Sequence, residues 1–180
     1  MERRMIFAGF GGQGILLMGQ LSAIAGMREG RHVSWIPAYG AEMRGGSCNC
    51  SVVISDEPVG SPMVTAADAV IAMNQLSMSL FERALVPGGL LLINGSLIDA
   101  APARADVRIA KIPCSGIADG LGNARVANMV MLGALIALDP IFSPETLAEA
   151  LREKLGKSKE SLIPVNREAI ARGMAAAAGL

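Results

Sequence analysis

A glycine motif near the amino terminus constrains the fold of this sequence more than any other feature. Gly9, Gly11 and Gly14 are spaced Gly-x-Gly-x-x-Gly, between an apolar run at 5–8 and a segment at 15–28 whose apolar residues recur at helical spacing. A strand, a tight glycine turn and a helix in this order are typical of the opening of an α/β domain. The helix N-terminus there presents free N–H groups to an anion, although close packing of the helix on a sheet would also require glycine.

The rest of the chain continues the alternation of strands and helices. We predict strands at 32–36, 47–55, 68–73, 90–93 and 107–112, and helices at 75–85 (capped by Asn74), 126–138, 144–155 (capped by Ser143) and from Asn166 to about 178, with a turn at 87–89. The first strand, helix and second strand read as a βαβ unit. The alternation predicts an α/β layered fold with a mostly parallel sheet flanked by helices. We expect residues 1–180 to form a single domain, with a helical C-terminal part from about residue 122.

A second group of chemically capable residues follows the second strand. Arg44, beside Gly45 and Gly46, can bind a carboxylate or phosphate through two N–H groups, and Tyr39 and Glu42 could hydrogen-bond across the loop. A solvated surface loop would explain the same residues equally well. In a parallel sheet this loop would lie at the same edge as the glycine motif, where open α/β sheets bind ligands.

The sequence lacks the full set of residues that several common kinds of functional site require. A dinucleotide site needs an acid at the end of the second strand, about 20 residues beyond the glycines, where Ile36, Pro37 and Ala38 stand instead. Because no lysine precedes Lys111, the first glycine turn lacks the lysine of a phosphate loop. Gly156, Lys157 and Ser158 resemble the end of such a loop, but Leu151 stands where its first glycine should be, which argues against nucleotide hydrolysis. His32 is the one histidine, and its spacing to other residues matches no catalytic triad.

The three cysteines favour structural roles. Cys48 and Cys50 would share one face of a strand, and Cys114 is the one further thiol, whereas an iron–sulfur cluster usually needs four. Small buried side chains are the simpler interpretation. An odd number of cysteines also suggests reduced thiols, and hence a cytoplasmic protein.

Composition indicates a protein that associates with other proteins. The chain is 52% hydrophobic and 18% charged with a net charge of zero, which excludes disorder as the main theme and argues against nucleic-acid binding. Its longest apolar stretch, 126–138, is too short to span a membrane. We expect that stretch to be a helix that is buried or lies in an interface. Asn123, Arg125 and Asn128 near its start would need a helix cap or a partner subunit.

Taken together, the segments 9–15, 39–46, 51–55, 87–89 and 128–134 resemble the gamma subunit of 2-oxoacid (pyruvate/ketoisovalerate-type):ferredoxin oxidoreductases in order and spacing. The resemblance implies a Rossmann-like subunit of a hetero-oligomer that converts a 2-oxoacid to an acyl-CoA and reduces ferredoxin. It implies thiamine diphosphate and magnesium between alpha and beta subunits, and iron–sulfur clusters in beta or delta subunits. This chain would shape the site, help handle CoA, and be inactive alone.

The candidate ligand-contacting residues come from the two glycine-containing loops. They are Gly9, Gly11, Gly12, Gln13, Gly14, Tyr39, Glu42, Arg44, Gly45 and Gly46. No residue is predicted to be catalytic or to bind a metal. Three alternatives stay open: the corresponding subunit of an indolepyruvate oxidoreductase, a free-standing nucleotide-binding domain, and a purely structural assembly module.

Overall fold

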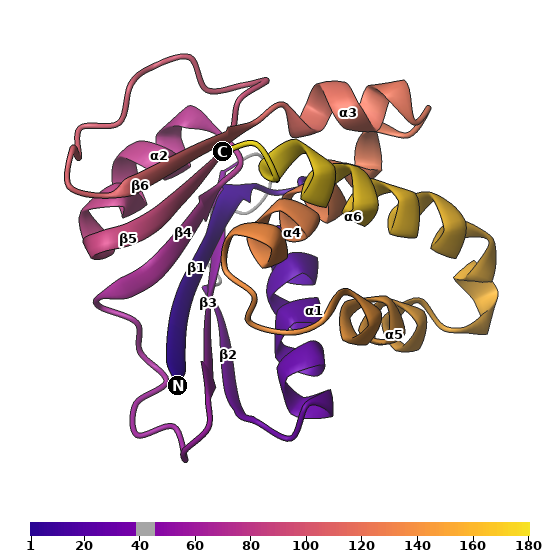
Figure 1. The fold of residues 1–180 in the computed structure, drawn as a ribbon, viewed down its shortest axis with the longest axis horizontal. Helices are drawn as coiled ribbons and strands as arrows, with labels where there is room; N and C mark the ends of the chain where they lie inside the picture. Colours follow the sequence, from indigo (N-terminus) through magenta and orange to yellow (C-terminus); the bar gives the residue numbers. More distant parts are fainter. Residues whose placement is uncertain (39–45) are drawn as a thin grey trace.

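The computed structural model describes residues 1–38 and 46–180, and these residues form a six-stranded sheet in the order β2-β3-β1-β4-β5-β6 (Figure 1). The strands are β1 (Glu2–Phe10), β2 (His32–Ala38), β3 (Ser47–Ser55), β4 (Ala67–Ala72), β5 (Leu85–Asn94) and β6 (Arg108–Ile112). β1, β4, β5 and β6 are parallel, whereas β3 is antiparallel to both β1 and β2. The sheet is therefore mixed but mostly parallel, which confirms the predicted fold class.

Helices cover the two faces of the sheet unequally. They are α1 (Ile15–Arg28), α2 (Gln75–Phe81), α3 (Cys114–Gly120), α4 (Ala127–Leu138), α5 (Pro144–Leu155) and α6 (Ile163–Ala177). The larger apolar cluster lies between the sheet and α1, α3, α4, α5 and α6, whereas a smaller cluster lies under α2 on the other face (Figure 1). Among the described residues, no helix is both long and apolar enough to cross a membrane.

Several local predictions are confirmed because the capping chemistry is explicit in the sequence. α1 and β3 begin and end at the expected residues. Asn74 Oδ1 accepts a hydrogen bond from the Ser77 amide at 2.9 Å at the start of α2, and Ser143 Oγ accepts one from the Thr146 amide at 3.0 Å at the start of α5.

The expected βαβ unit is present, because β1 and β2 are parallel strands of one sheet joined by α1, but another strand separates them. β2 does not pair with β1; β3 lies between them and pairs with both, Phe10 opposite Ser47 and Ala38 opposite Asn49. Strand periodicity reports which residues are buried but not which strand is the neighbour. Here β3 follows β2 after a short connection, which permits antiparallel pairing of the two strands. The other edge of β3 then pairs with β1, so β3 lies between β1 and β2.

The chain around β5 also differs from expectation. α2 ends at Phe81 and a 3-10 helix, Glu82–Ala84, follows, so the predicted helix to residue 85 is wrong; Leu85 already belongs to β5. The predicted turn at 87–89 lies inside β5. Gly88 has φ +76° there, and the pairing with β4 jumps from Leu85 to Leu90. The glycines thus produce a bulge rather than the end of a strand.

The start of the last helix is also misplaced by the sequence. α6 begins at Ile163, three residues before Asn166. Pro164 stands in the first turn, where the missing N–H costs nothing, so it can begin the helix earlier. Asn166 is not a cap; its Nδ2 donates to the Leu162 carbonyl at 2.7 Å. The short helix α3 was not expected.

α4 is buried within the chain itself, as its all-round apolar sequence predicts. It crosses α6 at two reciprocal glycine contacts. Gly133 lies against the backbone of Ile170, and Gly173 lies against the backbone of Val130. Two helices can approach this closely because neither glycine carries a Cβ at the crossing.

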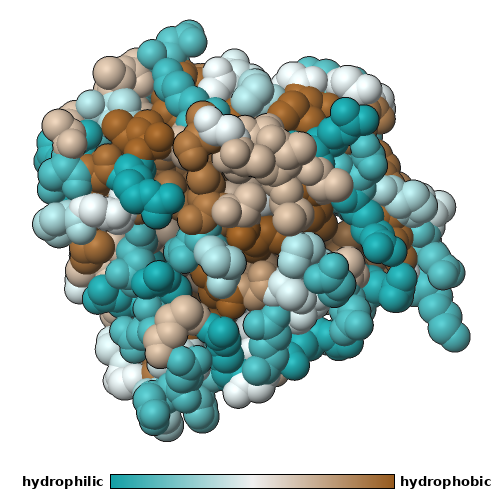
Figure 2. All heavy atoms as spheres, viewed as in Figure 1, coloured by the Kyte–Doolittle hydropathy of each residue, from teal (hydrophilic) through white to brown (hydrophobic). Residues whose placement is uncertain are grey.

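Hydrophobic and polar side chains are unevenly distributed over the face seen in Figure 2. Hydrophobic surface is more frequent in the upper half, where α2, β6 and the end of α6 lie, whereas polar side chains dominate the lower edge. The upper half also contains the carboxyl ends of the parallel strands, where the candidate site is found.

Candidate functional site

The glycine loop joins β1 to α1 at the carboxyl edge of the sheet. Gly12 and Gly14 adopt φ values of +95° and +74°, in the left-handed region that favours glycine. Gly12 faces open space, whereas a Cβ on Gly14 would overlap the side-chain amide of Asn128. Gly14 therefore has a packing role, while Gly12 leaves the backbone accessible. Within the described part of the chain, no side chain caps α1.

Gln13 fastens this loop to the end of β4. Its Oε1 accepts hydrogen bonds from the Phe10 amide at 2.7 Å and from Asn74 Nδ2 at 3.2 Å. Its Nε2 donates to the Met73 carbonyl at 3.2 Å. These three hydrogen bonds fix the side chain of Gln13 within the loop. Its role is therefore to hold the loop in place rather than to contact a ligand.

Hydrogen-bonded polar side chains continue this edge from β4 to β5. Asn94, fully buried at the end of β5, donates from Nδ2 to Ser115 Oγ at 3.0 Å and to the Met73 carbonyl at 3.5 Å. Its Oδ1 accepts from the Ser96 amide at 3.1 Å, and Ser96 Oγ accepts from the Gly116 amide at 3.2 Å. The sequence analysis missed Asn94, although a lone amide directly after an apolar strand was a usable signal.

A hollow of about 280 Å³ opens beside the glycine loop. Its lining includes Gly12 and Gln13 from the loop, Ser115 from α3, and Arg125 from the turn before α4. Arg125 is exposed and is the cation of this lining. The hollow therefore combines an open glycine backbone with a guanidinium, which is an arrangement suited to an anionic group.

The asparagines that flank Arg125 find their partners within the chain. Asn123 Oδ1 accepts from the Arg125 amide at 3.1 Å. Asn128 Oδ1 accepts from the Met129 amide at 2.9 Å, and its Nδ2 donates to the Gly14 carbonyl at 3.4 Å. Their polar groups are thus used as local caps and as a tie to the glycine loop. Of the three polar residues at this helix start, Arg125 is the one left facing the hollow.

Four of the predicted site residues, Tyr39, Glu42, Arg44 and Gly45, lie outside the described residues. The residues that flank them lie where the sequence analysis expects. The Gly11 amide donates to the Gly46 carbonyl at 3.4 Å, and Ala38 ends β2 at the same edge as the glycine loop. Both ends of segment 39–45 therefore meet the carboxyl edge of the sheet.

The cysteines lie in the core, as expected from the sequence. Cys48 and Cys50 lie in the larger apolar cluster, together with Cys114. Burial raises the pKa of the Cys50 and Cys114 thiols to about 12, and it also raises the pKa of Cys48. They are therefore neutral thiols, unsuited to nucleophilic or metal-binding roles. In residues 1–38 and 46–180, no cluster of His, Cys, Asp or Glu is placed to hold a metal ion.

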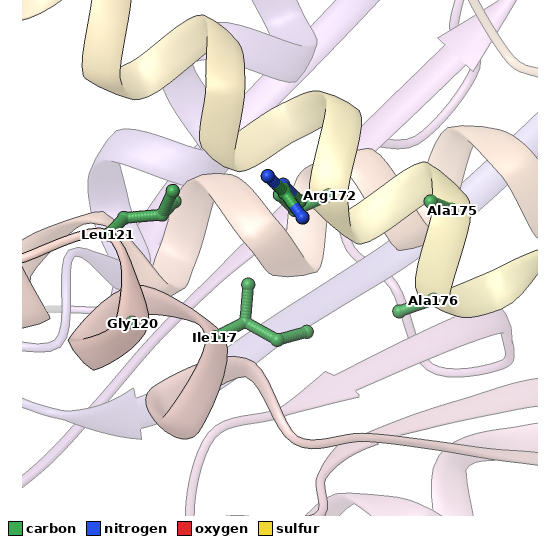
Figure 3. A pocket seen from close by; sticks show the side chains of 6 residues that line it. All are labelled: Ile117, Gly120, Leu121, Arg172, Ala175 and Ala176. Atoms are coloured by element: carbon green, nitrogen blue, oxygen red, sulfur yellow. The ribbon is translucent and has the colours of Figure 1, made fainter.

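A larger hollow of about 510 Å³ separates α3 from α6 (Figure 3). Ile117 of α3 and Leu121, directly after α3, line it on one side, and Ala175 and Ala176 of α6 line it on the other. Its one charged side chain is Arg172, whose Nε lies 2.8 Å from Glu168 Oε1. Apart from Arg172, which is paired with Glu168, this lining is apolar, whereas the smaller hollow joins an open glycine backbone to an arginine. We therefore take the smaller hollow as the candidate site.

Comparisons with known proteins agree with one another. The sequence matches the family Pyruvate ferredoxin/flavodoxin oxidoreductase over residues 4–176. Ketoisovalerate oxidoreductase subunit VorA of Methanothermobacter thermautotrophicus is 43% identical over 166 residues, which cover 92% of this chain and 34% of that protein. The chain thus spans about a third of the length of this relative.

Two solved structures share the fold over the whole chain. The gamma subunit of a keto/oxoacid ferredoxin oxidoreductase from Geobacter sulfurreducens superposes with a TM-score of 0.86 at 28% identity, covering 99% of both chains. The 2-oxoglutarate:ferredoxin oxidoreductase of Magnetococcus marinus, with 2-oxoglutarate, coenzyme A and succinyl-CoA bound, gives a TM-score of 0.91 at 31% identity. That match covers 99% of this chain and 31% of the other.

Proposed function

This chain belongs to the pyruvate ferredoxin/flavodoxin oxidoreductase family, and we propose that it is the gamma subunit of a 2-oxoacid:ferredoxin oxidoreductase. The observation that carries the proposal is the match to a free-standing gamma subunit over 99% of both chains. The complex would oxidatively decarboxylate a 2-oxoacid, transfer the acyl group to CoA and reduce ferredoxin. We also propose that residues 1–180 act as one domain, since helices on both faces pack on one sheet.

Within such an enzyme, this chain would contribute to the binding of CoA rather than to redox chemistry. Membership of the family implies that thiamine diphosphate, magnesium and iron–sulfur clusters would be held by alpha, beta and delta-type partner subunits. The three buried thiols of this chain are consistent with that proposal for the clusters. The open backbone at Gly12 and the guanidinium of Arg125 suit the phosphates of CoA. Arg44 would approach the same edge from segment 39–45. Choice of the 2-oxoacid would then lie with the thiamine-binding subunits.

The alternative of a free-standing dinucleotide-binding domain is disfavoured by the topology. Because β3 separates β2 from β1, the end of β2 does not lie beside the glycine loop as it does in a dinucleotide fold. Ala38 at that end also brings no acid for a ribose. Tight binding of NAD or a flavin by the isolated chain would contradict the proposal. Co-purification of a tagged chain with thiamine-binding and iron–sulfur subunits, under anaerobic conditions, would support it.

The role in CoA binding is tested in the assembled enzyme. We expect Arg125→Ala and Arg44→Ala each to raise the KM for CoA about tenfold, the loss of one charge-assisted contact, while kcat changes little. Arg152→Ala, which removes an exposed arginine of α5, is the matched control and should leave KM unchanged. Unchanged KM values in both site variants, with intact assembly, would favour a purely structural module.

A further inference from the structure

Ser115 brings a hydroxyl group to the hollow beside the glycine loop. It is half-buried in α3 and lines the hollow together with Gly12 and Arg125. Its Oγ accepts a hydrogen bond from Asn94 Nδ2 at 3.0 Å. Because a hydroxyl carries one O–H in addition to its lone pairs, this bond leaves the O–H of Ser115 to be donated to another group.

The hydrogen bonds of Asn94 fix the direction of that donation. Its Oδ1 accepts from the Ser96 amide at 3.1 Å, and its Nδ2 also lies 3.5 Å from the Met73 carbonyl, so the N–H end of the amide faces Ser115. The oxygen of Ser115 is thus the acceptor, and its O–H points away from Asn94. Since Asn94 is fully buried while Ser115 lines the hollow, the O–H is directed toward the hollow rather than the core.

Within residues 1–38 and 46–180, one protein acceptor competes for this O–H. It is the sulfur of the neighbouring Cys114, which is fully buried. A thiol sulfur is a weak acceptor, whereas a hydrogen bond to an ionised oxygen is about twice as strong as one between neutral groups. An anion in the hollow would therefore take the O–H of Ser115 away from Cys114.

The donors that face the hollow come from three different elements. Gly12 belongs to the loop after β1, Ser115 to α3 and Arg125 to the turn before α4. The oxygens of a phosphate are arranged tetrahedrally, so they can meet donors on several sides, whereas a planar carboxylate presents two oxygens in one plane. The lining therefore fits a phosphate group better than the carboxylate of a 2-oxoacid.

We propose that Ser115 is a specificity-determining residue of the candidate site, whose O–H, oriented by Asn94, donates to a phosphate group of CoA that Arg125 also contacts. The inference rests on the proposed function and deepens it by naming a residue that distinguishes a phosphate from the carboxylate of the other substrate. Two parts of CoA share this chemistry, the 3′-phosphate and the pyrophosphate, and the test separates them.

The test uses the assembled oxidoreductase with Ser115→Ala in this chain. Ser79→Ala is the matched control, because Ser79 is exposed on α2 and its Oγ likewise accepts from a side-chain amide, Gln75 Nε2 at 3.3 Å, but it does not line the hollow. Co-purification and thermal melting establish that each variant is folded and assembled. Calorimetric titration then gives the Kd of CoA and of dephospho-CoA, which lacks the 3′-phosphate. Pantetheine, which lacks both phosphate groups, is titrated at millimolar concentration, and steady-state kinetics give the KM of the 2-oxoacid.

We expect Ser115→Ala to bind CoA about tenfold more weakly, through the loss of one hydrogen bond to a charged group. Its affinity for pantetheine and its KM for the 2-oxoacid should not change, and Ser79→Ala should bind CoA as the wild type does. An equal loss with dephospho-CoA supports the inference and assigns the contact to the pyrophosphate. A loss seen with CoA but not with dephospho-CoA supports it and assigns the contact to the 3′-phosphate.

The opposite results overturn the inference. Equal binding of CoA by Ser115→Ala and the wild type, or an equal loss with pantetheine, would show that the hydroxyl does not contact a phosphate, and would leave the proposed function standing. A raised KM for the 2-oxoacid with unchanged affinity for CoA would assign the hollow to the carboxylate instead. Failure of the wild-type chain to assemble into an enzyme that binds CoA would overturn the proposed function itself.

Discussion

Replacement of Gly173 by alanine should destabilise the protein, although alanine is the better helix former. A Cβ at Gly173 would overlap the carbonyl oxygen of Val130 and lie 2.7 Å from its carbonyl carbon and 3.0 Å from the Ala134 amide nitrogen. These are backbone atoms of α4 and cannot rotate away. Ordinary carbon–carbon contacts need about 3.5 Å, so α4 and α6 would have to separate by about 1 Å.

The magnitude follows from two opposing effects. Alanine within a helix gains about 1 kcal/mol over glycine, while overpacking of a filled core costs about 1–3 kcal/mol and occasionally more. The reciprocal contact at Gly133 loosens together with that at Gly173, which places the cost at the upper end. We therefore expect a net loss of about 2 kcal/mol in the free energy of unfolding, or a fall in Tm of about 4–8 °C for a chain of this length.

Urea denaturation followed by circular dichroism measures this loss. Gly116→Ala is the matched control, because Gly116 is exposed within α3 and the nearest atom to its Cβ, Ser96 Oγ, is 3.8 Å away. That variant should gain about 0.5–1 kcal/mol. If Gly173→Ala were as stable as the wild type, the helix crossing would be looser than described and the reasoning from close approach would fail.

Three further predictions concern groups buried or capped in the fold. Burial raises the pKa of Cys50 and Cys114 to about 12 in the folded chain, whereas the ordinary pKa of a cysteine thiol is 9.0. As the pH rises above 9, these thiols therefore lose their protons in the unfolded chain before they do in the folded chain. The free energy of unfolding should then fall by about 1.4 kcal/mol per pH unit for each thiol between about pH 9 and 12. When this free energy is measured by urea denaturation at a series of pH values, it should fall less steeply with pH in a Cys50→Ala/Cys114→Ala variant than in the wild type. Ser143→Ala removes the cap of α5 and should cost about 1 kcal/mol in urea denaturation; no loss would mean that the cap bond is replaced by water. Asn94→Leu removes the hydrogen bonds that this buried amide makes to the half-buried Ser115 hydroxyl and to the backbone amide of the exposed Ser96. It should cost about 1–3 kcal/mol in thermal unfolding, while an unchanged Tm would contradict the network.

Elements with explicit local chemistry could be predicted from the sequence. The glycine turn, the apolar period of α1 and the capping residues Asn74 and Ser143 each specify a boundary through contacts within a few residues, and the structure agrees. The place of β3 could not be predicted in this way. Its pairing with β1 depends on residues 45 or more positions apart along most of the register, and periodicity carries no information about partners.

The residues of the candidate site also divide into those that could be recognised from the sequence and those that are brought together only by folding. The glycine loop was found because its residues are adjacent in sequence. Arg125 was noticed beside an apolar helix, but its place beside Gly12 depends on the packing of α4 against α1. Gln13 was expected to offer a hydrogen bond at the helix start. Two of its actual partners, Met73 and Asn74, lie between β4 and α2, about 60 residues further along the chain. Residues distant in sequence meet at the site because of the order of the strands in the sheet, and this order could not be predicted from the sequence.

The insertion of β3 between β2 and β1 has a consequence for the order in which the chain folds. β1 is made first, yet both of its neighbours, β3 and β4, come later in the sequence. β2 and β3 are joined by a short connection, so the loop-closure entropy of their pairing is small compared with that of β1 and β3. We expect the backbone amides that are hydrogen-bonded between β2 and β3 to become protected from exchange early in pulsed hydrogen-exchange labelling. The amino-terminal strand that carries the glycine loop would be locked into place afterwards, once β3 provides an edge to receive it.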